Sequence, residues 1–232
     1  MKMLPIKDKT PQICWKTVEK TLTLTGEPVL ELKLSWPQGE GAGPLVRSVS
    51  RYYARLAQGW QRQWEREGYL CACVALAQKR EQSRPFTPWT ASLSGQVTLD
   101  NGEYLSIAML AREVHADGRV LEYRWGDTWA WQDGAPVPLG ALFQGQKRWR
   151  KQLRSQLEQA VEQSRRSGAY LDQEIKKPLR RWFSPSRFAL SPEGLELYYP
   201  QCTLAPAVEG ALVFRLPLPE SVQIAAKEEK EA

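Results

Sequence analysis

Residues 89–131, WTASLSGQVTLDNGEYLSIAMLAREVHADGRVLEYRWGDTWAW, decide the fold of this chain. Two turn dipeptides, Asn101-Gly102 and Asp117-Gly118, interrupt the stretch, and Asp133-Gly134 follows it directly. Glycine beside Asn or Asp supplies the positive φ angles that tight hairpin turns require. The segments between these turns are rich in β-branched and aromatic residues, which favour strands. The sequence therefore predicts an antiparallel meander with strands at residues 90–99, 103–114 and 119–131.

The residues before the meander predict a hairpin followed by a long helix. Residues 15–25 and 29–36 alternate apolar and polar side chains, and residues 37–43 are expected to end the second strand. Pro44 suits the first position of a helix, because its missing N–H has no partner there. We expect a bend or break near Gly68, after which residues 71–82 resume the helix. The apolar stripe of this helix is expected to face the core and comprises Leu45, Val49, Tyr52, Tyr53, Leu56, Trp60 and Trp64.

The residues after the meander predict helices followed by short strands. The expected elements are a short link at 138–143, helices at 146–167 and at 171–183 with an interruption at Pro178, a hairpin of 187–190 with 195–199, and a closing strand at 211–216. Because the helices come in blocks between antiparallel strands, the fold class is predicted as α+β, a mainly antiparallel sheet with long helices packed on one face. The predicted organisation is an N-terminal extension at 1–14, a single domain at 15–220 and a frayed, charged tail at 221–232.

The composition narrows the class of protein. The 232 residues are 42% hydrophobic and 25% charged, which is ordinary globular usage and excludes a disordered or coiled-coil chain. Four cysteines are sparse, and no apolar run resembles a secretory signal or a membrane helix, so we expect a cytoplasmic protein that contacts no membrane. With one histidine, His115, expected to be exposed near a turn, we predict no metal, no cofactor and no catalytic site.

Three tryptophans form the first candidate binding site. Trp125, Trp129 and Trp131 have equal parity, so on a regular strand they project from one face. Such a row can stack on a glycan or anchor a protein partner. In the alternative interpretation the rings cover Tyr52, Tyr53 and Trp60 of the long helix inside the core. A bulge at Gly126 would disturb the common face.

A basic region forms the second candidate site. Residues 147–187 contain twelve Lys or Arg and four acidic residues, a net charge of +8, which leaves −2 for the rest of the chain. This region predicts, as an alternative function, binding of nucleic acid or another polyanion. The other interpretation is a solvated helix face. The candidate residues are Lys147, Arg148, Lys151, Arg154, Arg165 and Arg166.

Four stretches, at residues 102–107, 131–143, 188–199 and 204–217, carry a family resemblance. They read GEYLSI, WQDGAPVPLGALF, FALSPEGLELYY and LAPAVEGALVFRLP. Over most of residues 15–220 the chain resembles the lysozyme-sensing C-terminal domain of bacterial RsiV-type anti-sigma factors, a domain family of otherwise unknown function. The resemblance implies a sheet carrying helices and a non-enzymatic module that binds an unknown protein or glycan.

The chain departs from the RsiV pattern in two ways. It shows neither the sigma-binding segment nor the membrane helix of those proteins, so signalling by their route is not expected. The net charge of +6 would repel a basic lysozyme, so a different ligand is expected.

Overall fold

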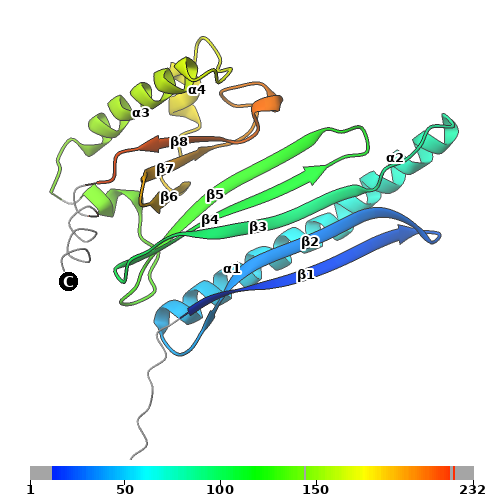
Figure 1. The fold of residues 1–232 in the computed structure, drawn as a ribbon, viewed down its shortest axis with the longest axis horizontal. Helices are drawn as coiled ribbons and strands as arrows, with labels where there is room; N and C mark the ends of the chain where they lie inside the picture. The colour runs from blue at the N-terminus through cyan, green and yellow to red at the C-terminus, as the bar shows by residue number, and fades with distance from the viewer. Residues whose placement is uncertain (1–11, 144, 220–221, 223–232) are drawn as a thin grey trace, which may run out of the picture.

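The computed structural model describes residues 12–143, 145–219 and 222. In this part of the chain, eight strands form a five-stranded sheet, β1-β2-β3-β4-β5, and a three-stranded sheet, β6-β7-β8 (Figure 1). The elements are β1 (Gln12–Leu24), β2 (Glu27–Glu40), α1 (Pro44–Gln63), the π-helical η1 (Trp64–Gly68), α2 (Tyr69–Glu81), β3 (Trp89–Asp100), β4 (Tyr104–Val114), β5 (Val120–Ala130), the 3-10 helix η2 (Leu139–Phe143), α3 (Trp149–Arg166), α4 (Lys176–Arg181), β6 (Phe188–Ser191), β7 (Gly194–Tyr199), the 3-10 helix η3 (Ala207–Glu209) and β8 (Leu212–Leu216).

The predicted meander is confirmed as β3, β4 and β5, which pair antiparallel in sequence order. Gly102, Gly118 and Gly134 have φ angles of 76°, 82° and 66°, as the turn dipeptides predict. The predicted hairpins β1–β2 and β6–β7 are present as well, and the α+β fold class is confirmed. Strands β2 and β3 pair parallel, whereas the remaining pairs of neighbouring described strands are antiparallel.

The second strand ends within residues 37–43, as expected, but four residues beyond the predicted boundary at residue 36. Strand β2 continues to Glu40, and Pro37 pairs opposite Trp15. Proline is tolerated here because β3 pairs with β2 only along Leu30–Leu34, so the far edge of β2 near Pro37 has no strand that would require a donor.

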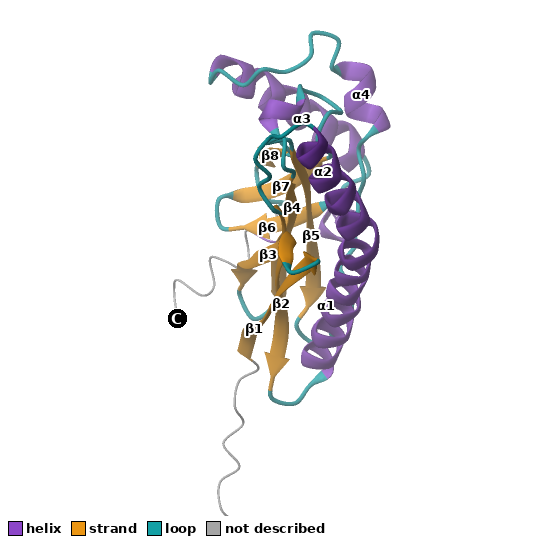
Figure 2. Ribbon diagram, turned by 90° about the vertical axis from the view of Figure 1, so that its right-hand side faces the viewer, coloured by secondary structure: helices purple, strands orange, loops and turns teal. Residues whose placement is uncertain are grey.

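The long helix does not break at Gly68, because the π-helical turn of η1 joins α1 directly to α2. At 100° per residue, Leu76 would point roughly 120° away from Trp64. A π turn holds one extra residue, which reduces this offset to about 20°. Trp64, Ala72 and Leu76 are therefore all buried. The helix is the connection between parallel strands β2 and β3, and α1 and α2 cover one face of the five-stranded sheet (Figure 2).

The described residues form two hydrophobic cores. One lies between the five-stranded sheet and the α1–α2 helix and includes Val49, Tyr53 and Ile107. The other lies between the three-stranded sheet and α3 with α4 and includes Leu157 and Leu197. Several boundaries differ from the predictions. Strand β1 begins inside the predicted extension, α3 begins at Trp149, and the helix predicted at 171–183 is reduced to α4. Pro178 lies in the first turn of α4, where it replaces no helical donor and causes no interruption.

Several sequence-based expectations fall partly or wholly outside the described residues. Of the predicted extension, residues 1–11 lie outside them, and so does the predicted tail except Val222, which is buried in the second core. In the described part of the chain, no helix is both long enough and apolar enough to cross a bilayer. The four cysteines are free.

The two sheets meet along a seam formed by β6 on the sheet face opposite α1. Ser106 on β4 accepts a hydrogen bond from the Leu190 backbone N–H at 2.8 Å and lies 3.0 Å from the hydroxyl of Thr128. Both hydroxyl-bearing side chains are at most 2% exposed. A Cβ on Gly126 would lie 2.6 Å from the Phe188 carbonyl oxygen and 2.7 Å from the Ala189 Cβ. Only glycine at this position lets β6 approach β5 so closely.

A half-buried carboxylate ties α1 to the opposite face of β5. The Asp127 carboxylate accepts hydrogen bonds from the Tyr53 hydroxyl at 2.9 Å and from the Tyr52 hydroxyl at 3.1 Å. Burial raises the pKa of Asp127 above its ordinary value, although the two tyrosine hydrogen bonds act in the opposite direction. The carboxylate therefore holds α1 on β5, but burial of its charged form lowers the free energy of unfolding.

Two Gly→Ala substitutions, one in the seam and one on α1, should have opposite effects on the free energy of unfolding. Gly126→Ala should lower the free energy of unfolding by about 1–3 kcal/mol, because its Cβ meets backbone that cannot move away without separating the sheets. Gly59→Ala, in α1 with open space around the added methyl, should raise it by up to about 1 kcal/mol. Urea unfolding of both variants checks this, and a neutral Gly126→Ala would contradict the seam.

Asp127 predicts a specific pH dependence of stability. Its raised pKa means that the folded state binds the proton more tightly than the unfolded state, so its contribution is greatest below about pH 4 and is lost as the pH rises through the folded pKa. Asp127→Asn removes the buried charge and keeps polar atoms beside both tyrosines. The stability of this variant relative to wild type should increase as the pH is raised from 4 toward 7 in urea titrations. A difference that stays constant or decreases would show that the carboxylate is not penalised by burial.

Candidate functional site

The candidate site is a groove between α3 and α4, on the outer side of the second core. Helix α3 buries Leu153, Leu157 and Val161, which recur every fourth residue and pack toward β8. Trp149, at the start of α3, is stacked on Phe143 with the ring centres 5.2 Å apart. This stack fixes the first turn of α3 and the apolar end of the groove.

Two contacts hold α4 alongside α3. The Arg165 guanidinium, in the last turn of α3, donates to the backbone carbonyls of Asp172 and Gln173 and so fixes the connecting loop. Gly168, with a φ of 94°, ends α3 and turns the chain back. At the other end, the Tyr199 hydroxyl on β7 donates to the Leu179 carbonyl of α4 at 3.1 Å. The groove is therefore anchored on the three-stranded sheet.

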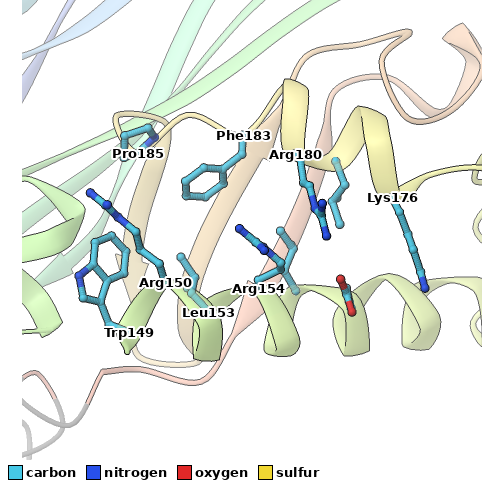
Figure 3. Close-up of a pocket in the computed structure, with 11 residues that line it drawn as sticks. Trp149, Arg150, Leu153, Arg154, Lys176, Arg180, Phe183 and Pro185 are labelled. Atoms are coloured by element: carbon cyan, nitrogen blue, oxygen red, sulfur yellow. The ribbon is translucent and has the colours of Figure 1, made fainter. Parts of the chain in front are cut away.

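The groove has an apolar floor and a basic rim and encloses about 380 Å³. Leu153, Leu157 and Leu179 form the buried floor, and Trp149, Phe183 and Pro185 gather at one end. Figure 3 shows Arg154 from α3 and Arg180 from α4 reaching into the space between the helices, with Lys176 further along α4. The groove thus changes from an apolar end to a cationic end.

The cations of the rim have no carboxylate partner. The ion pairs in the described part of the chain include none from Arg150, Arg154, Lys176 or Arg180. Arg150 instead lies over the Trp149 ring, 5.1 Å from its centre. One acidic residue, Glu158, lines the groove beside these four cations, so the lining carries an excess of positive charge. A cationic rim over an apolar floor attracts an anion that has an apolar body.

The structure separates the six residues predicted to bind a polyanion. Arg154 lies in the groove, and Lys147, Arg148 and Lys151 are exposed at the N-terminal end of α3. Arg165 is engaged with backbone carbonyls, and Arg166 forms an ion pair with Glu162 at 3.6 Å.

Three basic residues of the groove were missing from the predicted set: Arg150, Lys176 and Arg180. Their signal in the sequence is a basic pair four residues apart flanking a buried leucine in each helix, Arg150 and Arg154 around Leu153 and Lys176 and Arg180 around Leu179.

The predicted tryptophan row is corrected by the structure. Trp125 and Trp129 are 6% and 5% exposed and project toward α1, where Trp129 meets Tyr52 edge-on at 5.3 Å and Trp125 stacks on Trp60 at 6.3 Å. Because α1 covers these two rings, the core interpretation describes them, and only an edge of Trp129 contributes to the lining of a hollow beside Tyr52. Trp131 follows the end of β5, and its indole N–H donates to the Asp100 carboxylate at 2.7 Å.

The bulge that would have disturbed the common face is not present, because Gly126 pairs in register with Ala108 and instead admits β6. One further expectation along the meander is wrong. His115 is not exposed at its turn, because its ring stacks on Trp89 with centres 3.7 Å apart and its side chain is 8% exposed. The register that pairs Thr90 with Val114 brings these two rings together.

Comparisons with known proteins agree with this architecture. Two solved DUF3298 structures have the same fold. The one from Bacteroides fragilis is 12% identical with a TM-score of 0.67, covering 96% of this chain and 99% of that protein. The one from Pseudomonas aeruginosa is 11% identical with a TM-score of 0.56, covering 90% and 92%. No curated protein matches. The model of the family described as "Protein of unknown function (DUF3298)" matches residues 141–218, which contain both groove helices and the three-stranded sheet. The family match is therefore confined to residues 141–218, and the two solved structures extend the likeness in fold to at least 90% of the chain.

Proposed function

We propose that this protein is a non-catalytic binding module whose α3–α4 groove takes a small organic anion with an apolar body. The observation that carries the proposal is the pair of guanidiniums of Arg154 and Arg180, which form no ion pair in the described part of the chain and reach from the two helices into the space beside a floor of buried leucines. A volume of about 380 Å³ falls within the range of small-ligand sites.

The chemistry of the ligand follows from the two parts of the groove. An apolar body displaces water from Trp149, Leu153 and Phe183, and this burial provides the main attraction. A carboxylate, sulfonate or phosphate then meets Arg154 and Arg180 in surroundings less polar than water, where paired charges interact more strongly. A ligand with only one of the two parts would leave either the floor or the cations unsatisfied.

The resemblance to RsiV-type sensing domains supports a binding role over a catalytic one. In this proposal the ligand is sensed by occupancy of the groove, and no bond in it is broken. The alternative prediction, nucleic-acid binding through residues 147–187, requires contacts along the exposed cations Lys147, Arg148 and Lys151. The two functions differ in the residues that contact the ligand, since Lys147, Arg148 and Lys151 lie outside the groove lining.

The groove predicts tight binding of an anionic, apolar dye such as 1-anilinonaphthalene-8-sulfonate. In fluorescence titrations the double variant Arg154→Gln/Arg180→Gln should bind the dye about tenfold or more weakly than wild type, because it loses both charge-assisted hydrogen bonds. Arg166→Gln is the matched control, since this arginine lies on the same helix but pairs with Glu162 outside the groove. The Arg166→Gln variant should bind the dye as tightly as wild type does.

The folded state of each variant is checked by its urea midpoint, because the dye also binds partly unfolded chains. Equal dye affinity in the double variant and wild type, with all midpoints unchanged, would reject the groove as the site. Displacement of the dye by a single-stranded oligonucleotide, with a loss of affinity at Lys147 and Lys151 variants, would favour the polyanion alternative instead.

A further inference from the structure

A second surface carries unpartnered charge, on the solvent side of α1. Arg47, Arg51 and Arg55 are exposed and follow one another every fourth residue, so they form a ladder with a rise of about 6 Å between neighbours. The whole of α1 contains no Asp or Glu. Like charges four residues apart destabilise a helix, so this ladder opposes the stability of α1.

The surroundings of the ladder do not neutralise it. Hollows flank it on both sides, one of about 720 Å³ next to Tyr52 and one of about 420 Å³ next to Lys16, and neither is lined by an acidic residue. In the described part of the chain, no ion pair involves Arg47, Arg51 or Arg55. The face is therefore complementary to a row of negative charges.

The larger hollow also offers a rigid, partly apolar wall. The Tyr52 ring is 37% exposed, and its position is fixed by the hydrogen bond to Asp127 and by edge-on contact with Trp129. Pro44, Leu56 and Pro136 line the same hollow. Side chains of a partner can pack here without ordering a mobile surface, and Arg and Tyr are residue types enriched at the centres of protein interfaces.

We propose that the α1 face, Arg47, Arg51 and Arg55 with the hollow at Tyr52, docks an acidic amphipathic helix of a protein partner. Residues 44–56 span about 18 Å, which matches three turns of a partner helix. Asp or Glu at every fourth position of that helix repeats with the same rise as the arginines, and its neighbouring apolar residues fill the hollow. A phosphate backbone would meet the arginines but would leave the apolar wall unused. This proposal does not depend on a ligand in the α3–α4 groove.

Two peptides of identical composition test the proposal with the full-length protein. In the first, a labelled helical peptide carries Glu at every fourth position with leucines on the adjoining stripe, and in the second the same residues are scrambled. In anisotropy titrations the ordered peptide should bind at least about tenfold more tightly than the scrambled one. Arg47→Gln/Arg51→Gln/Arg55→Gln should remove this difference. Arg62→Gln is the control, because Arg62 lies on α1 outside both hollows and bonds to the Gln58 carbonyl.

Three results would overturn the proposal. These are no binding of the ordered peptide by wild type, equal binding of the two peptides, and undiminished binding by the triple variant with its urea midpoint unchanged. A single-stranded oligonucleotide serves as a competitor. If it bound more tightly than the ordered peptide and lost affinity in the triple variant, the face would be a phosphate-binding surface and not a helix dock.

Discussion

The arrangement of this molecule depends on the close approach of β6 to β5 at Gly126. With no side chain at that position, the Phe188 backbone lies directly on the five-stranded sheet, and the Leu190 N–H reaches the buried Ser106 hydroxyl. Strand β6 is paired to β7, and β7 to β8, so the seam fixes the whole three-stranded sheet. Helices α3 and α4 pack on that sheet and define the groove. A glycine on the five-stranded sheet thereby sets the position of a candidate site built on the three-stranded sheet.

The strands and turns were predictable because their signals are local. Asn101-Gly102 and Asp117-Gly118 specify hairpins without reference to the rest of the chain. The parallel pairing of β2 with β3 could not be predicted, because these strands are separated by the long helix and neither sequence carries a signal of the pairing. The continuous helix was missed for a related reason. The π turn at Trp64–Gly68 keeps the buried residues before and after it on the same side of the helix. The need for this turn can be recognised only when it is known which residues face the sheet.

Prediction of the site from the sequence was limited by what charge and parity can show. Equal parity correctly placed Trp125 and Trp129 on one face of β5, but parity cannot tell whether that face meets solvent or α1. The basic region appeared uniform, whereas in the fold Arg165 secures a loop and Arg180 lines the groove. The arginine ladder of α1 does not show in the segment charge, because acidic residues elsewhere leave a net −2 outside residues 147–187. Charge sums over sequence segments hide such faces.

A ligand site between α3 and α4 is tested most directly by a map of backbone amide shifts in a ¹⁵N-labelled sample titrated with 1-anilinonaphthalene-8-sulfonate. We expect saturable shifts confined to the groove, at Trp149, Leu153, Leu157, Leu179 and Phe183, with the seam at Ser106 and Leu190 undisturbed. Shifts concentrated on α1, or spread over both cores without saturation, would contradict a ligand site between α3 and α4.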